Sequence, residues 1–432
     1  MFISSSLNIN SKGNLAIGGC DCVDLAEKYG TPLYVLDEGL IRKNCRAYKD
    51  TLDRFYDGNA LVIYASKAFC TTSMYKILNE EGLGADVVSG GEFYTAMKAG
   101  FPADKIFFHG NNKSADELEY TISNGVGRVV VDNYHELGLV SDICKKLGVC
   151  QKILLRVTPG VDAHTHSFIS TGQIDSKFGI AIDTGEAIDF VKAALNTENV
   201  CVTGIHCHIG SQIFDYNPFA CAAEKMTEFI VEIKKTTGYE VEELDLGGGF
   251  GIKYTSEDDP IPYEEFMKNI SKIIKKFAAE KGIKLPFIVM EPGRSIVGEA
   301  GITLYTAGVV KEIPGIRKYV SIDGGMGDNP RYALYESEYQ AVIANKPDAP
   351  YDDEATLVGK CCESGDIIIN NGKLQKIESG DIVAVLSTGA YNYSMSSNYN
   401  RLPRPAAVMV SDGVDRIIVE RETYEDLVRN DR

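Results

Sequence analysis

Between residues 60 and 300 the sequence repeats one unit: an apolar run rich in β-branched residues, a polar or glycine-containing turn, and an amphipathic stretch. Strands that alternate with helical patterns predict βαβ units around a parallel sheet. Eight such units in roughly 240 residues match a closed (β/α)8 TIM-like barrel, although an open doubly wound sheet gives the same alternation. The eight apolar runs are Leu61–Ala65, Ala85–Ser89, Lys105–His109, Arg128–Asp132, Ile153–Val157, Val202–His208, Glu243–Leu246 and Phe287–Met290.

The period changes after about residue 300, where long helical patterns are nearly absent and glycine, proline and asparagine separate short strand-like runs. Two runs near the N-terminus, Leu15–Ile17 and Leu33–Val35, also read as strands. We therefore expect a barrel over residues 38–300, and a mostly β domain built from 1–37 and 301–432. The later runs are Thr303–Val310, Lys318–Ile322, Asp366–Ile369, Asp381–Leu386 and Ala407–Val410.

Charge and composition exclude several classes of protein. Lys and Arg total 44 against 61 Asp and Glu, a formal charge of −17, which argues against nucleic acid as a partner. No apolar run reaches the roughly 18 residues of a membrane span, and the first residues lack the basic and apolar regions of a secretory signal. The eleven cysteines are scattered without a CxxC pair. We expect a cytoplasmic protein with reduced thiols and no membrane association.

Functional side chains collect where the predicted barrel strands end, which is where barrel enzymes carry their catalytic groups. Lys67 follows the first strand, and a desolvated lysine there can attack a carbonyl, although a surface lysine would give the same pattern. His208 could bind a metal as part of a His-x-His pair, as could the pair His164 and His166, or it could stack on a ring. No partnered set of carboxylates and histidines recurs, so we expect no metal.

The glycine run Gly247–Gly251 allows close approach of a ligand, and its N–H groups can cradle a phosphate. It is neither a P-loop nor a dinucleotide-binding motif, because the spacing of both is missing. Glu291, after the eighth strand, is the residue that best separates the candidate reactions. A carboxylate facing a pyridine nitrogen keeps that nitrogen protonated and suits decarboxylation, whereas an arginine there would suit racemisation.

Taken together, the motifs resemble those of the alanine racemase-like fold type III decarboxylases that use pyridoxal 5′-phosphate (PLP), and among them the diaminopimelate decarboxylase family. The similarity covers almost the whole chain. It rests on the segments 30–35, 64–68, 85–92, 175–179, 206–212, 245–249, 291–294, 323–326, 328–335, 362–366, 389–391 and 399–405.

The resemblance implies a role for each matching residue. Lys67 would carry PLP, His208 would stack on its ring and Glu291 would pair with the ring nitrogen. The remaining cofactor-binding positions, mostly around the phosphate, would be Ser211, Gly248, Gly249, Gly251, Gly293, Arg294 and Tyr391.

For the substrate, the resemblance implies meso-2,6-diaminopimelate, converted to L-lysine and CO2 in the last step of lysine biosynthesis. Cys362 would act as proton donor in the partner subunit's site, so the enzyme would be a homodimer with shared active sites. The substrate itself would meet Arg294, Arg331, Tyr335, Glu363 and Tyr391.

Three positions depart from the family pattern: Tyr332, Lys360 and Ala407. Tyr332 and Lys360 bear on the local loop geometry and on the substrate preference. The alternatives that remain are an ornithine or arginine decarboxylase, a carboxynorspermidine decarboxylase, an alanine racemase, a single-barrel PLP homeostasis protein and a metal-dependent barrel hydrolase. The β domain argues against the single barrel, and Glu291 argues against the racemase.

Overall fold

The computed structural model describes residues 2–161 and 175–432. The chain divides into two compact units. The barrel unit comprises Cys45–Gly251 and Pro260–Gly293, and the β-rich unit comprises Met1–Asn44, Ile252–Asp259 and Arg294–Arg432. The pair His164 and His166 lies outside the described residues.

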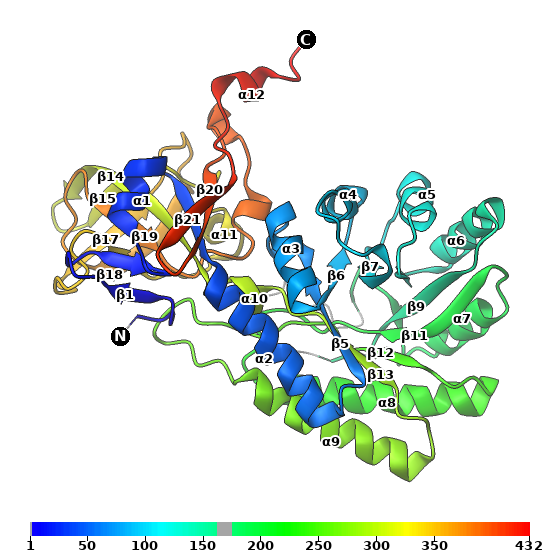
Figure 1. The fold of residues 1–432 in the computed structure, drawn as a ribbon. Helices are drawn as coiled ribbons and strands as arrows, with labels where there is room; N and C mark the ends of the chain where they lie inside the picture. Colours follow the sequence, from blue (N-terminus) through cyan, green and yellow to red (C-terminus); the bar gives the residue numbers. More distant parts are fainter. Residues whose placement is uncertain (1, 162–174) are drawn as a thin grey trace. The chain divides into compact units, whose positions relative to one another are not determined.

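The barrel unit is a closed ring of eight parallel strands, each paired with the next along the chain, with the last strand returning to the first (Figure 1). Closure confirms the predicted barrel and shows that the open-sheet alternative is wrong. The strands are β5 (Ala60–Ala65), β6 (Gly84–Val87), β7 (Ile106–Phe108), β8 (Arg128–Val131), β9 (Gln151–Thr158), β11 (Val200–His206), β12 (Glu243–Asp245) and β13 (Phe287–Met290).

Polar caps start the helices that follow the strands, because the first N–H groups of a helix need acceptors. Ser89, Ser114 and Asn133 each accept a backbone N–H, and Ser114 forms a capping box with Glu117. The caps fix where each strand-to-helix loop ends. The barrel helices are α3 (Thr72–Glu81), α4 (Gly90–Lys98), α5 (Ala115–Ser123), α6 (Tyr134–Leu147), α7 (Glu186–Leu195), α8 (Asn217–Thr237) and α9 (Tyr263–Lys281); α2 (Glu38–Tyr56) precedes them.

An apolar layer fills the interior of the barrel. Ile63, Phe107, Val130, Leu154 and Val289 from five strands form one buried cluster. Because this layer closes the barrel, polar side chains are confined to the ends of the strands. A further strand of two residues, β10 (Ile180–Ala181), pairs with β9.

The β-rich unit contains a small three-stranded sheet and a nine-stranded sheet. The centre of the large sheet is β14 (Gly301–Ile313), which pairs with β4 (Leu33–Asp37), β15 (Arg317–Ile322) and β19 (Ile382–Val385). The other strands are β1 (Leu7–Ile9), β2 (Leu15–Ile17), β3 (Cys20–Asp21), β16 (Ala341–Ile343), β17 (Asp353–Val358), β18 (Ile367–Leu374), β20 (Ala406–Ser411) and β21 (Val414–Val419).

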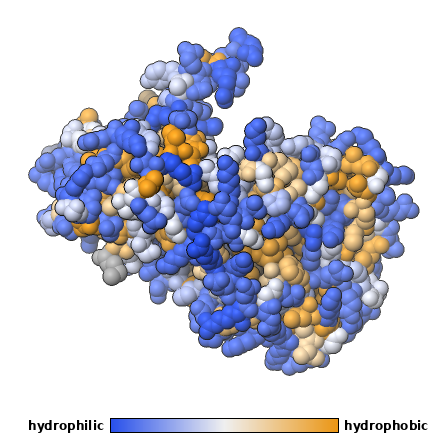
Figure 2. All heavy atoms as spheres, viewed as in Figure 1, coloured by the Kyte–Doolittle hydropathy of each residue, from blue (hydrophilic) through white to orange (hydrophobic). Residues whose placement is uncertain are grey.

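Helices are short in this unit, which confirms the predicted second, mostly β domain: α1 (Cys22–Tyr29), α10 (Arg294–Val297), α11 (Arg331–Tyr335) and α12 (Tyr424–Val428). The face seen in Figure 2 is largely hydrophilic, with hydrophobic residues in small groups between. Among the described residues, no helix combines the length and the apolar character that crossing a membrane requires.

Candidate active site

A buried carboxylate stands at the end of β13. Glu291 Oε1 lies 2.9 Å from Nε2 of His109, and Oε2 lies 3.5 Å from Nε2 of His206. The two imidazole rings meet edge to face with centroids 4.9 Å apart. His109 follows β7 and His206 ends β11, so three separate strand ends deliver this cluster. The contact between Oε1 and His109 is close but lacks hydrogen-bond geometry, and no other described residue donates to this buried oxygen.

Three buried carboxyl groups share this part of the barrel, and their pKa values separate. Burial raises the pKa of Asp86 and, with the charge of Glu291, raises that of Asp245 well above its usual range. Burial opposes ionisation of Glu291 as well, but the rings of His109 and His206 outweigh it and hold its pKa well below normal. Of the three, Glu291 is therefore the carboxyl whose ionised form is most favoured.

The same trio could hold a metal ion, because His109, His206 and Glu291 offer ligand atoms that all lie within 4.8 Å of one another. His208, the histidine for which the sequence left a metal role open, does not belong to the set. Burial lowers the pKa of His206 to about 3, so its ring is neutral at neutral pH. A metal at this position would be coordinated by Glu291. Metal binding by the trio and pairing of Glu291 with a pyridine nitrogen therefore exclude each other.

His208 is held in one tautomer by the glycine loop. The N–H of Gly248 donates to its Nδ1 over 3.2 Å, which leaves the ring proton on Nε2. Burial, and then the charge of Lys67, lower the pKa of His208 well below its usual value. The ring is thus neutral and fixed, as a group that stacks on an aromatic ligand must be.

The protein's own backbone requires glycine at two positions of the glycine run. A Cβ at Gly248 would lie 2.0 Å from the carbonyl oxygen of Glu291, and one at Gly249, which has φ +112°, would lie 2.4 Å from that of Gly210. The N–H groups of residues 247, 248 and 251 donate within the protein. Within the described part of the chain, those of Gly249 and Phe250 have no acceptor and are available to a phosphate.

Lys67 lies in the short turn Ser66–Ala68 directly after β5, with its side chain exposed. Its charge acts on the pKa of His208, Asp86 and Glu92, which places it near the polar cluster. Gly293 closes the loop beside it: a Cβ there would lie 2.9 Å from that of Ala65. Ser211 follows β11 by a few residues and is half-buried. The barrel unit thus gathers Lys67, His208 and Glu291 at the same ends of the strands.

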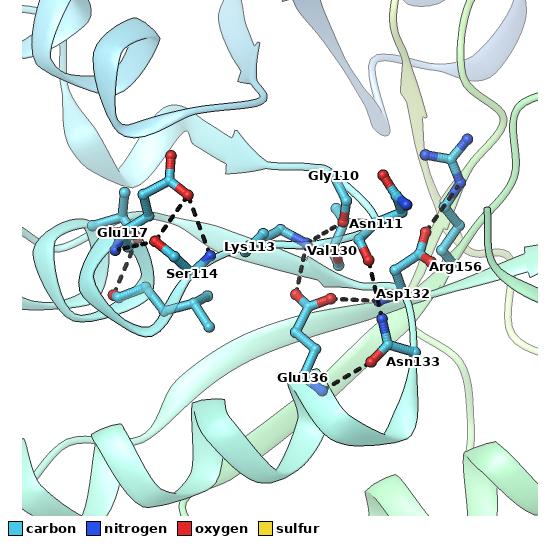
Figure 3. Close-up of polar contacts among 12 residues, drawn as sticks. Gly110, Asn111, Lys113, Ser114, Glu117, Val130, Asp132, Asn133, Glu136 and Arg156 are labelled. Carbon is cyan, nitrogen blue, oxygen red and sulfur yellow. Dashed lines mark hydrogen bonds and ion pairs between the residues drawn. The ribbon is translucent and has the colours of Figure 1, made fainter. Parts of the chain in front are cut away.

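A buried ion pair anchors the loop that carries His109 (Figure 3). Lys113 Nζ donates to Glu136 Oε1 at 2.6 Å, to the carbonyl of Val130 at 2.7 Å and to that of Gly110 at 2.8 Å. The other oxygen of Glu136 accepts the N–H of Asp132 at 3.0 Å. All three lysine donors are used, so the loop after β7 is fixed to the end of β8 and the start of α6.

A second contact joins the loop after β7 to the start of α6. The amide of Asn133, which caps α6, donates to the carbonyl of Asn111 at 3.2 Å. Beyond it, Asp132 Oδ1 lies 3.8 Å from Nε of Arg156, whose guanidinium lies 4.2 Å from the ring centroid of Phe178 (Figure 3). These contacts connect the support of His109 to the end of β9.

In the β-rich unit, two of the predicted substrate arginines share one tyrosine. Arg294 donates to the hydroxyl of Tyr254 at 2.5 Å, and the guanidinium of Arg331 lies 4.4 Å from the centroid of the same ring. Arg294 also lies 4.7 Å from the ring of Tyr391, so the structure brings three of the predicted residues together. Tyr335, at the end of α11, is half-buried.

The segment with Cys362 and Glu363 forms an exposed turn of the β-rich unit. The buried Asp366 holds it by accepting the N–H groups of Cys361 and Met326, at 2.7 and 2.6 Å. Cys362 donates its own N–H to Asn400 at 2.7 Å. Burial raises the pKa of the neighbouring Cys361 thiol to about 11, so the exposed Cys362 is the accessible thiol of the two.

Sequence reasoning missed His109, Tyr254 and the Lys113–Glu136 pair. His109 carries the same signal that singled out Lys67 and Glu291, because it too follows an apolar run. Tyr254 carries no such signal: it lies in the irregular segment Ile252–Asp259, and only the fold brings it to the two arginines.

The barrel and the polar cluster at its strand ends define a PLP-dependent decarboxylase of fold type III, and residues 38–298 match the family model described as "Pyridoxal-dependent decarboxylase, pyridoxal binding domain". A relative from Bacillus methanolicus named diaminopimelate decarboxylase is 53% identical over 98% of both chains. One of the same name from Bacillus subtilis is 49% identical and covers 100% of this chain and 98% of its own.

A solved structure gives the same result. Diaminopimelate decarboxylase from M. jannaschii, in co-complex with L-lysine, has a TM-score of 0.92 at 38% identity and covers 100% of this chain and 99% of its own. The chain belongs to the diaminopimelate decarboxylase family.

Proposed function

We propose that this chain uses PLP to decarboxylate meso-2,6-diaminopimelate to L-lysine and CO2, the last step of lysine biosynthesis. The observation that carries the proposal is Glu291, a buried carboxyl that contacts two histidines and has a pKa well below normal, while the pKa values of Asp86 and Asp245 are raised. Full-length relatives named diaminopimelate decarboxylase support this carboxy-lyase reaction.

The barrel residues fit the cofactor. Glu291 offers an unsatisfied buried oxygen for a pyridine nitrogen, and His208 offers a neutral ring. The N–H of Gly249 is available to a phosphate. We assign Lys67 to covalent attachment of PLP within a binding domain of residues 38–300. The other cofactor contacts in the proposal are Ser211, Gly248, Gly251, Gly293, Arg294 and Tyr391.

When bound, PLP accepts the electron pair that the broken bond between Cα and the carboxylate leaves behind. Glu291 holds a proton at the ring nitrogen, because an ionised carboxylate in a buried site stabilises the adjacent cation. Glu291 lies against His109 and His206, and these contacts lower its pKa, which favours the ionised form. His208 limits the position of the ring, since its own ring is fixed by Gly248.

For the far end of the substrate we assign Arg294, Arg331, Tyr335, Glu363 and Tyr391. Arg331 is buried, and its hydrogen bonds go to the hydroxyls of Tyr339 and Ser337, at 2.7 and 3.1 Å. Within the described part of the chain it has no carboxylate partner. A buried guanidinium with only neutral partners favours binding of a carboxylate from a ligand.

The proposal includes a homodimer with shared sites, in which the exposed Cys362 reaches the other subunit as proton donor. A protonated thiol can supply the proton that replaces CO2 at Cα. It also includes a cytoplasmic location, where the amino-acid precursor would be available.

The test is CO2 release by the purified protein from meso-diaminopimelate, L-lysine, L-ornithine and carboxynorspermidine at equal concentrations. We expect release from meso-diaminopimelate to be faster by about a hundredfold or more. When L-lysine or L-ornithine places its single carboxylate at the reacting end, no carboxylate is left at the far end and a buried guanidinium stays unpaired. Faster release from ornithine or carboxynorspermidine would leave the assignment as a PLP-dependent decarboxylase intact but would contradict meso-diaminopimelate as the substrate. Absence of visible absorbance from the protein after incubation with PLP would contradict both the enzyme class and the substrate.

A further inference from the structure

Tyr254 is fixed by the β-rich unit before any ligand is considered. Its N–H donates to Oδ2 of Asp258 at 2.9 Å, and the same oxygen accepts the N–H of Thr255 at 2.9 Å. On the other side, Lys253 donates its N–H to Glu299, and its carbonyl accepts the hydroxyl of Ser387 at 2.7 Å. The tyrosine side chain is therefore held on a backbone that is anchored on both sides.

The ring of Tyr254 forms one wall around Arg331. The guanidinium lies 4.4 Å from its centroid and 5.5 Å from that of Tyr339, and the two rings are perpendicular at 5.4 Å. Tyr339 accepts from Arg331 and donates its own hydroxyl to Asn392 at 3.1 Å. The orientation of Arg331 thus depends on a flat surface that only an aromatic residue provides.

The hydroxyl of Tyr254 holds the second arginine. Arg294 donates to it, and its guanidinium lies 5.7 Å from the ring centroid. One side chain thus contacts both guanidinium groups, one through its face and the other through its oxygen. Two buried cations repel each other, so their spacing depends on the group between them. The face and the oxygen are separable by mutation.

We propose that Tyr254 is a positioning residue that sets the separation of Arg294 and Arg331, and thereby the preference for a ligand with a carboxylate at the far end. The inference rests on the proposed function, in which these arginines bind that carboxylate. It adds a residue that need not touch the substrate.

The test separates the carboxylate from the rest of the ligand. L-Lysine retains the far carboxylate and cadaverine lacks it, while both present an amine at the other end. The variant Tyr254→Phe removes the oxygen and keeps the ring. We expect it to weaken inhibition by L-lysine about tenfold and to leave inhibition by cadaverine unchanged. For meso-diaminopimelate we expect a raised KM with little change in kcat.

The matched control is Tyr56→Phe, which removes a buried hydroxyl that donates to the carbonyl of Pro286 at 3.0 Å in the barrel unit. We expect it to leave both inhibition constants unchanged. Tyr254→Leu removes the ring as well, and should weaken L-lysine further while cadaverine stays constant. Thermal unfolding and PLP content show whether each variant is folded.

Two results overturn the inference. Equal loss for L-lysine and cadaverine in a folded Tyr254→Phe protein means that the hydroxyl serves general packing. No loss for either means that Arg294 is positioned without it. Failure of the proposed function is distinct, because the wild type would then not prefer meso-diaminopimelate at all.

Discussion

The Lys113–Glu136 pair offers a stringent test of how the site is supported. Both side chains are buried, with exposed fractions of 1% and 3%, and the lysine also serves two carbonyls. The variant Lys113→Met fills similar space but leaves a buried carboxyl without its cation. Because Gly110 follows His109 directly, the change also releases the loop that places His109 against Glu291.

The cost follows from these contacts. Removing one partner of a buried ion pair costs about 3–5 kcal/mol, since the remaining charge is uncompensated. Burial raises the pKa of Glu136 even with Lys113 present. Without the lysine its pKa rises further, so the carboxyl can take up a proton. We therefore expect the loss of stability to be largest at high pH and smaller at pH 5.

The assay is urea unfolding of wild type, Lys113→Met, Glu136→Met and the double variant, at pH 5 and pH 8. The double variant removes both charges and should recover at least half of the loss, because no unpaired charge remains. The carbonyls of Gly110 and Val130 stay without their donor in every variant that lacks Lys113. Activity should fall in Lys113→Met beyond the loss of folded protein, because His109 is no longer held.

A double variant as unstable as Lys113→Met would refute the reasoning, because the cost would then lie in the lost carbonyl bonds. A loss below about 1 kcal/mol in Lys113→Met would refute it as well, since an exposed pair typically contributes that little. Full activity in the folded Lys113→Met protein would leave the argument about stability intact but would contradict the claim that Lys113 positions His109.

Four further predictions test the assigned roles. Glu291→Gln should lower decarboxylation by orders of magnitude while PLP still binds, whereas Glu243→Gln, at the start of the neighbouring strand β12, should leave activity unchanged; equal activity in both variants would contradict the role of Glu291. Mixing inactive Lys67→Ala and Cys362→Ala subunits should restore about a quarter of normal sites by random exchange, and no recovery would place both residues in one chain. Arg331→Ala should lose activity on meso-diaminopimelate without losing PLP content, measured by absorbance. Burial raises the pKa of Asp328 to about 7, above its unfolded value, so its contribution to stability is complete at low pH and is lost as pH rises through 7; Asp328→Asn should flatten the change in urea midpoint between pH 5 and 8.

The barrel could be predicted because its strands are buried on both faces and read as continuous apolar runs, as in Phe287–Met290. The missed strands of the other unit look different. Val414–Val419 contains Asp415 and Arg416 and is partly exposed, and Asp353–Val358 begins with two acidic residues. Such strands lie at or near a sheet edge, where the apolar signal is diluted.

The site divides in the same way. Glu291 and Lys67 could be selected because each follows a strand, and the barrel fold brings all strand ends to one face. Tyr254 could not, because its contacts with Arg294 and Arg331 bridge 40 and 77 positions of sequence through an irregular segment. The burial of Arg331 among hydroxyls is likewise a property of packing, which no local pattern records.

Strand β4 has a consequence for the synthesis of the chain. Leu33–Asp37 is hydrogen-bonded on one side to β14 and on the other to β20, Ala406–Ser411. At typical translation rates, roughly 20 to 75 seconds pass between the synthesis of β4 and the synthesis of its partner β20. The barrel strands, each paired with the next along the chain, can close while β4 still has both edges open. In a nascent chain this apolar strand is therefore unpaired until β14 is made and keeps one open edge until β20 is made, and it is where a chaperone would have most to protect.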